Sequence, residues 1–189
     1  MEKYISKKEK ASYGFAAVGS YMVAGITQSY LMYFFTDILI IPSAFVMMLM
    51  IVARVWDALN DPMMGVIVDR TSTKYGKMRP YVLIGSFLML VTTIVLFMPL
   101  TGAPTMFKMI FAAVSYIIFG MAYTLTDVPA MGLMSVATPN SDERASLLSF
   151  YVTVGSVGSL LPVGLLTIFQ SFIPEKYVYF AMSIFVGII

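Results

Sequence analysis

Four ionisable side chains interrupt otherwise apolar stretches of the chain: Arg54, Asp57, Asp61 and Asp127. Arg54 and Asp57 are three residues apart, and Asp57 and Asp61 are four apart, so a helix would place all three on one face. Asn60 brings an amide oxygen beside them. Three carboxylates against one guanidinium leave a surplus of negative charge if all are ionised. Such a cluster in an apolar setting favours binding of a cation or a proton.

Oxygen atoms are the ligands that this cluster offers, because the chain contains no Cys and no His. Hard cations prefer oxygen ligands, whereas transition metals also use thiolate and imidazole. We therefore expect Asp57 and Asp61 to bind an alkali cation or H⁺, with no other metal and no cofactor. The alternative is that Arg54 and one aspartate form a structural pair that locks helices together. That pair alone would leave the remaining carboxylates buried and uncompensated.

A proline follows the acidic residues twice. Pro62 comes directly after Asp61, and Pro129 lies two residues after Asp127. Each proline removes a backbone donor and frees the carbonyl four residues earlier. Unpaired backbone at membrane depth is tolerated where it lines a cavity. An ordinary helix kink is the alternative, but the repeated pairing with a carboxylate favours a polar cavity between the two helices.

The composition places these charges in a membrane protein. Of 189 residues, 59% are hydrophobic and only 12% are charged, and the mean hydropathy is +0.86. A soluble domain of this size could not bury so much apolar surface. A charge at the bilayer centre costs at least about 2.5–3.5 kcal/mol, so each ionisable group must face protein or water. The net charge of +2 is too small for a nucleic-acid-binding surface, and we expect no nucleic-acid partner.

Uncharged and weakly charged runs predict six membrane-spanning helices in one bundle, a single domain covering residues 1–189. A span needs about 20 apolar residues, and residues 11–36, 80–107 and 145–174 contain no charge at all. The last run, from Tyr177, would rise roughly 20 Å before the chain stops, short of a core of roughly 30 Å. We therefore expect a fragment or a half-protein with a truncated last helix. The predicted helices are about 13–37, 44–68, 80–101, 107–131, 145–172 and 177–189.

Basic residues predict the orientation of the bundle. Cytoplasmic loops carry an excess of Lys and Arg, and nine such residues fall on one side against Lys108 and Lys176 on the other. We expect a multi-pass protein of the plasma membrane whose N-terminus is cytoplasmic. Membrane lipid would surround the bundle. A signal peptide is the alternative for the first helix, but that uncharged run is too long. The nine residues are Lys3, Lys7, Lys8, Lys10, Arg70, Lys74, Lys77, Arg79 and Arg144.

Two further patterns favour packing over chemistry. Gly155 and Ser159, with Gly158 and Gly164 nearby, form a small-residue face that permits close approach of another helix. The aromatic residues within 30–35 are typical of a belt at the membrane–water interface.

The block 54–65, RVWDALNDPMMG, and the loop 69–80, DRTSTKYGKMRP, closely resemble one family. It is the glycoside–pentoside–hexuronide:cation symporters, the melibiose permease group of the major facilitator superfamily. The stretches 12–15, 30–37 and 123–129 are similar to its first and fourth helices. The resemblance implies an all-α transporter of twelve helices, of which this chain would be the N-terminal six. It also implies a C-terminal half as partner, in the same chain or a separate one.

The resemblance also implies roles for particular residues. Alternating access would couple entry of a glycoside or related sugar to Na⁺, Li⁺ or H⁺. Asp127 matches a carboxylate that receives sugar hydroxyls, and Arg54 fits a cavity position beside the cation site. The implied cation ligands are Asp57, Asn60, Asp61 and Thr124. The implied cytoplasmic gate consists of Gly65, Asp69, Arg70, Lys77 and Arg79.

The sequence departs from the family at three substrate positions. Tyr21 stands where the melibiose permease has a sugar-binding aspartate, and Met131 replaces an aromatic residue that stacks on the sugar. Val152 replaces a common helix-five arginine. Tyr21 could still stack on or hydrogen-bond to a ligand, although packing is an equal alternative.

Two other functions compete with symport of a sugar. A half-transporter could act only as a membrane interaction or regulatory partner, or the scaffold could carry a non-sugar, lipid-like solute. We do not expect an enzyme, because the chain lacks His, Cys and a Gly-x-Ser-x-Gly nucleophile motif.

Overall fold

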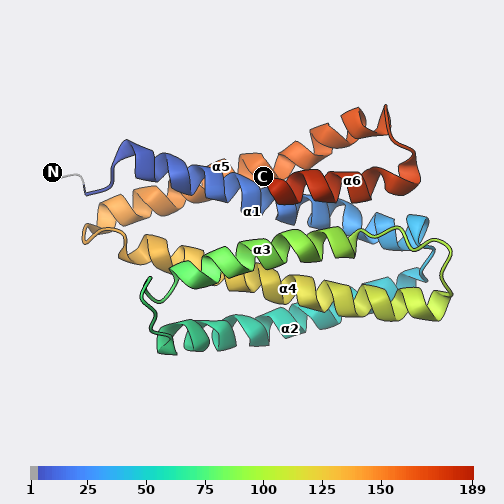
Figure 1. Ribbon diagram of the computed structural model, residues 1–189, viewed down its shortest axis with the longest axis horizontal. Coiled ribbons are helices and arrows are strands. Elements are labelled where there is room, and N and C mark those ends of the chain that lie inside the picture. Colours follow the sequence, from blue (N-terminus) through green and yellow to red (C-terminus); the bar gives the residue numbers. More distant parts are fainter. Residues whose placement is uncertain (1–3) are drawn as a thin grey trace.

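The computed structural model describes residues 4–189, so Lys3 of the basic N-terminal segment lies outside it. Within these residues the fold contains helices and no strand, and the helices run along one long axis (Figure 1). The all-α bundle predicted from the uncharged runs is confirmed. Its elements are α1 (Lys7–Tyr33), the π-helical turn η1 (Phe34–Ile38), α2 (Ser43–Arg70), α3 (Arg79–Leu96), α4 (Thr105–Val136), α5 (Ser141–Gln170) and α6 (Glu175–Ile188).

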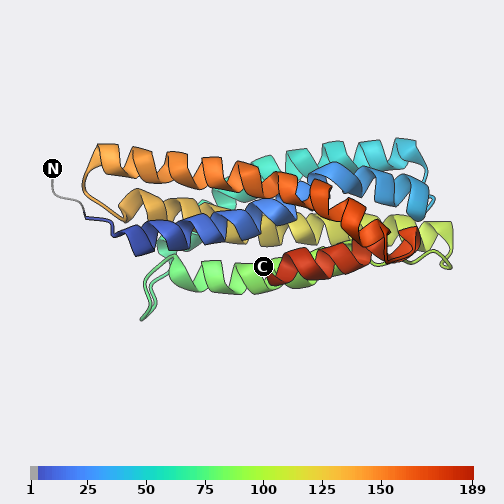
Figure 2. The same cartoon turned by 90° about the horizontal axis from the view of Figure 1, so that it is seen from above.

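Successive helices alternate in direction along the bundle. The start of α1 and the connections 71–78 and 137–140 lie at one end, and the connections 39–42, 97–104 and 171–174 lie at the other (Figures 1 and 2). One end of the bundle therefore carries Lys7, Lys8 and Lys10 of α1 together with Lys74 and Lys77 of the connection 71–78.

Four helices, α2 to α5, are long and apolar enough to cross a membrane among the residues described. α1 has 27 residues, but Ser20, Thr27 and Gln28 make it more polar. α6 has 14 residues, which corresponds to about 21 Å of helix. The chain is thus a multi-pass membrane protein whose first helix is more polar than the helices around it.

Helix ends follow local capping and differ in part from the predicted limits. α1 begins at Lys7 because Ser6 and Glu9 form a capping box, in which each side chain accepts from the other residue's amide. The hydrogen bond from the Ser6 amide lowers the pKa of the Glu9 carboxyl. α3 ends at Leu96 rather than near 101, because Pro99 disfavours helical backbone at the residue before it.

The end of α1 is irregular. The helix widens into η1, where the amide of Leu39 donates to the carbonyl of Phe34 at 2.9 Å. Ile40 follows with φ of 57°, a left-handed conformation that is strained for a β-branched residue. Such strain costs of order 1–3 kcal/mol and persists only where surrounding structure holds it.

Aromatic side chains at this end of the bundle pack inward. Phe34 and Phe35 are fully buried, and Phe34 lies edge-on to both Phe97 and Tyr179, with ring centroids 5.3 and 5.9 Å apart. The interpretation of these two residues as an interfacial belt was wrong, because they join the core between α1, α3 and α6. Tyr33 stays exposed and donates to Glu175 at 2.6 Å.

Glycines allow α1 and α5 to pack closely. A Cβ atom on Gly25 would overlap the backbone carbonyl of Ser159, and one on Gly158 would lie 3.0 Å from Cα of Val18. Gly155 lies against the ring of Tyr21. The predicted small-residue face is confirmed at Gly155, Gly158 and Ser159, whereas Gly164 borders open space.

Candidate functional site

A cavity of about 590 Å³ lies between α1, α2 and α4. Its lining includes five site residues that were predicted from the sequence. Arg54, Asp57 and Asp61 come from α2, and Thr124 and Asp127 come from α4. Around them lie polar and aromatic side chains that can donate hydrogen bonds or stack. The polar and aromatic lining consists of Thr27 and Gln28 from α1, Arg54, Trp56, Asp57 and Asp61 from α2, and Tyr116, Phe119, Tyr123, Thr124 and Asp127 from α4.

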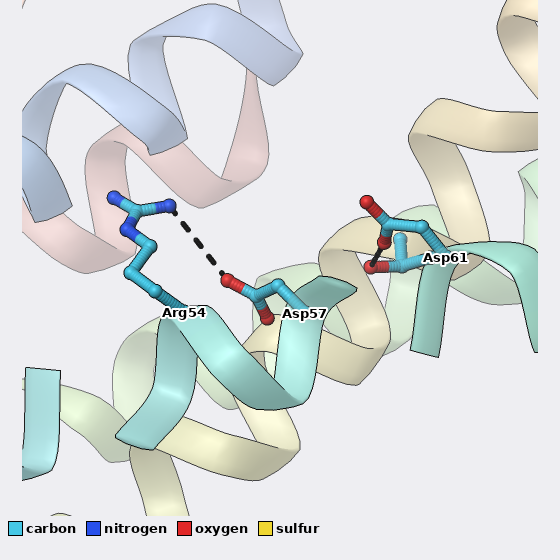
Figure 3. Close-up of polar contacts among 4 residues, drawn as sticks. Arg54, Asp57 and Asp61 are labelled. Carbon is cyan, nitrogen blue, oxygen red and sulfur yellow. Dashed lines mark hydrogen bonds and ion pairs between the residues drawn. The ribbon is translucent and has the colours of Figure 1, made fainter. Parts of the chain in front are cut away.

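Asp61 and Thr124 join α2 to α4 inside this cavity. The hydroxyl of Thr124 donates to Oδ1 of Asp61 at 2.8 Å, and Asp61 points into the space between the two helices (Figure 3). One carboxylate oxygen is thus oriented by α4, and the second remains available to a ligand. The two residues lie 63 positions apart in the chain, so the site exists only in the folded bundle.

Arg54 and Asp57 interact within α2. A guanidinium nitrogen of Arg54 lies 3.7 Å from Oδ2 of Asp57, across an i,i+3 spacing (Figure 3). The Arg54 side chain is 70% exposed, so the pair is weak. It connects two residues of the same helix, which contradicts the alternative of a pair that locks helices together. Arg54 instead offers its guanidinium to the cavity.

Gly120 makes room for the carboxylate of Asp57. A Cβ atom at this position would lie 3.1 Å from Oδ1 of Asp57. Gly120, Thr124 and Asp127 follow one another at spacings of four and three residues, so they form one stripe of α4. This stripe faces the carboxylates of α2.

Asp127 lies half-buried on the same stripe, three residues after Thr124. In the part of the chain that the structure describes, its carboxylate makes no hydrogen bond and no ion pair. A partly desolvated carboxylate is a strong acceptor for hydroxyl groups. The position of Asp127 therefore suits it to receive a polar ligand from the cavity.

Asn60 sits beside the cavity without lining it. Its side chain is 5% exposed, and its amide nitrogen has no hydrogen-bond partner among the described residues. Within residues 4–189 no group of three His, Cys, Asp or Glu side chains gathers as a metal site. A cation between Asp57 and Asp61 would accordingly need hydroxyl or amide oxygens to complete its shell, as at Thr124.

Tyr21 and Met131 lie outside the cavity lining. The Tyr21 ring packs edge-on to Tyr151 with centroids 5.9 Å apart and covers Gly155. Met131 packs against a second buried cluster that contains Tyr151. The structure thus gives both residues packing partners, and their role toward a substrate stays a prediction.

The implied gate residues gather at the end of α2 and the start of α3. The ammonium of Lys77 donates to the backbone carbonyl of Asp69 at 3.1 Å, across a loop that Gly76 turns with a φ of 93°. Asp69, Arg70, Lys77 and Arg79 are exposed and form no ion pair with another described residue. Gly65 has open space around it.

Several lining residues were not predicted from the sequence. Tyr116, Gly120 and Tyr123 share the stripe of α4 that carries Asp127, so their spacing from Asp127 was a usable signal. Trp56 lines the cavity, and its indole nitrogen is buried without a partner among the described residues. No spacing rule points to Thr27 and Gln28 on α1, because the packing of α1 on α5 sets which face turns to the cavity.

Comparison with known protein families gives one match over nearly the whole chain. The family described as MFS/sugar transport protein matches residues 12–189. This range includes every cavity residue named above.

Curated relatives are named as symporters and transporters. The chain is 37% identical over 161 residues to the symporter YjmB of Bacillus subtilis (strain 168), covering 84% of this chain and 35% of that protein. It is 34% identical to the inner membrane symporter YicJ of Escherichia coli (strain K12), covering 83% and 34%. It is 30% identical to the isoprimeverose transporter of Lactiplantibacillus pentosus, covering 81% and 32%. The chain thus spans about a third of the length of these relatives.

Proposed function

The chain belongs to the MFS/sugar transport protein family, and from this premise we propose that it is the N-terminal six-helix half of a cation-coupled sugar symporter. The resemblance to the melibiose permease group agrees with relatives named as symporters. A C-terminal half would close the cavity from the opposite side. We place the whole protein in the plasma membrane with its N-terminus in the cytoplasm.

The cation would bind where α2 meets α4. Asp57 and Asp61 supply carboxylate oxygens, and Thr124 supplies a hydroxyl that already contacts Asp61 at 2.8 Å. This hydrogen bond is the observation that carries the proposal, because it brings the acidic stripe of α2 to the same helix as Asp127. Na⁺, Li⁺ and H⁺ all suit a set of oxygen ligands. The amide oxygen of Asn60 is the fourth ligand that the resemblance implies.

The substrate would bind at Asp127 and the polar groups around it. Its carboxylate would accept hydroxyls of a glycoside or a related sugar, with Arg54 beside it. Tyr116 and Tyr123 on the same stripe of α4 line the cavity and offer aromatic faces to the apolar side of a sugar ring. The isoprimeverose transporter among the relatives is named for a sugar, which supports this class of substrate.

Coupling follows from the shared helix. A cation that neutralises Asp57 and Asp61 would draw α2 toward α4 and fix Thr124, and so hold Asp127 in position for substrate. Each ligand must then raise the affinity of the other by the same factor. Alternating access of the loaded and empty forms would complete the transport cycle.

The proposal is tested by sugar uptake into proteoliposomes that contain the full-length protein. A panel of glycosides is assayed with Na⁺, Li⁺ or a proton gradient, in wild type and in Asp61→Asn. We expect one cation to stimulate uptake in wild type and this stimulation to vanish in Asp61→Asn. Uptake by Asp61→Asn with unchanged cation dependence would refute the proposed site.

A further inference from the structure

A buried ammonium holds the connection between α1 and α2. Lys108 lies in the first turn of α4, where it is 6% exposed. Its Nζ donates to the backbone carbonyl of Leu39 at 2.9 Å, and it makes no ion pair with another described residue. A buried cation is costly unless its interactions compensate for lost water. A structural role is therefore expected for this hydrogen bond, which joins residues 69 positions apart in the chain.

The contacted carbonyl lies at the irregular end of α1. Leu39 is the last residue before Ile40, whose φ of 57° is strained for a β-branched side chain. Leu39 is also the C-cap of η1, which ends at Ile38, so its carbonyl lies at the negative end of the helix dipole. The positive ammonium of Lys108 interacts favourably with the negative end of this helix dipole. Its hydrogen bond to Leu39 also holds the neighbouring Ile40 in its strained conformation. Strain of this kind persists only where neighbouring structure enforces it.

The hydrogen bond from Lys108 to the Leu39 carbonyl, called the clamp below, lies close to the start of α2. α2 starts at Ser43, three residues after Ile40, and no side chain caps its N-terminus. From there Asp61 is 18 residues along α2, and Thr124 is 16 residues beyond Lys108 on α4. These separations correspond to about 27 and 24 Å of helix. Because the helices are rigid, a displacement of the start of α2 relative to the start of α4 would also displace Asp61 relative to Thr124.

We propose that Lys108 is a positioning residue for the cation site. It sets the register of α2 along α4 through the carbonyl of Leu39, and so aligns Asp57 with Gly120 and Asp61 with Thr124. This inference rests on the proposed function for its effect on cation binding. Its effect on the spacing of the two helices does not depend on that function.

The first test measures uptake by the full-length protein as a function of cation concentration. Lys108→Met, which keeps an unbranched side chain of nearly the same length and removes the ammonium, should raise the half-saturating cation concentration about tenfold, an effect within the range seen for residues remote from the ligand. The maximal rate per folded protein should change much less. Lys108→Arg, which keeps a donor, should restore the half-saturating concentration. An unchanged value in Lys108→Met would overturn the proposal.

The second test measures the helix register without transport. The chain contains no cysteine, so Met47→Cys on α2 and Met106→Cys on α4, both exposed, would carry spin labels in this half. With all other cysteines of the full-length protein removed, the distance distribution should be narrow in the Lys108 protein and broad or shifted in Lys108→Met. An identical distribution would overturn the clamp.

The controls separate the two proposals. If Asp61→Asn keeps its cation dependence, the proposed function fails, and the spin-label distances alone decide the role of Lys108. If Lys108→Met cannot be purified, the comparison is repeated in an Ile40→Gly background, where the left-handed φ is unstrained. Lys108→Met must then raise the half-saturating concentration relative to Ile40→Gly alone. Equal values in that background would count against the clamp.

Discussion

The hydroxyl of Thr124 on α4 lies 2.8 Å from Oδ1 of Asp61 on α2. This contact connects two helices across the cavity, and Asp127 lies one turn further along α4. A change in the charge of Asp61 therefore alters a hydrogen bond to α4, the helix that carries Asp127, the candidate substrate carboxylate.

Thr124→Ala should weaken cation binding and leave the bundle folded. A hydrogen bond to a charged group contributes about 1.5–3 kcal/mol, so the cation affinity should fall about tenfold or more. Thr124→Ser retains the hydroxyl and is the matched control, with affinity near wild type. Cation titration of substrate binding measures both. Equal affinity in the Ala and Ser variants would show that the hydroxyl is not a ligand or an orienting group.

Asp127→Ala should abolish substrate binding and spare cation binding. The carboxylate has no hydrogen bond or ion pair within the described residues, so its loss removes an acceptor without leaving a buried partner charge. Isothermal calorimetry with sugar and with cation separates the two effects. Asp142→Ala, on the exposed first turn of α5, is the control. Wild-type sugar affinity in Asp127→Ala would contradict the proposed substrate contact.

Gly120→Ala should impair the cation site by displacing Asp57. The added methyl group would lie 3.1 Å from Oδ1 of that carboxylate, closer than an ordinary contact. We expect weaker cation binding, with sugar affinity in the absence of cation unchanged. Normal cation affinity in Gly120→Ala would mean that the position of Asp57 against α4 is not needed.

Gly25→Ala should destabilise the protein by forcing α1 away from α5. A Cβ atom there would overlap the carbonyl of Ser159, and overpacking costs about 1–3 kcal/mol. Gly164→Ala, on α5 with open space around it, is the matched control. Thermal unfolding in detergent should show a lower midpoint for Gly25→Ala alone. Equal midpoints would refute the close approach of these helices.

The helical bundle and the acidic stripe were predictable from the sequence for physical reasons. Uncharged runs long enough to span a bilayer predict helices, because no other open-ended structure satisfies its backbone in lipid. The spacing of Arg54, Asp57 and Asp61 places them on one face of α2 whatever the rest of the fold. A charged Asp127 had to face protein or water and not lipid. It lines the cavity that also contains Arg54, Asp57 and Asp61.

Features that depend on packing between helices escaped sequence reasoning. Tyr21 is turned toward Tyr151 and Gly155 because glycines fix how α1 rotates against α5. Phe34 and Phe35 are buried, although their composition is equally typical of a membrane interface. The burial of Lys108 depends on the irregular end of α1. Pro42 indicates a break between helices there, but the residue types do not predict a left-handed conformation at Ile40.

Reciprocal binding tests the account most directly. Sugar affinity of the full-length protein is measured by calorimetry with and without saturating Na⁺, Li⁺ or H⁺, and cation affinity is measured with and without sugar. We predict that one cation raises sugar affinity, that sugar raises the affinity of that cation by the same factor, and that both effects disappear in Asp61→Asn. Sugar affinity that is independent of all three cations in wild type would contradict coupling at the contact between α2 and α4.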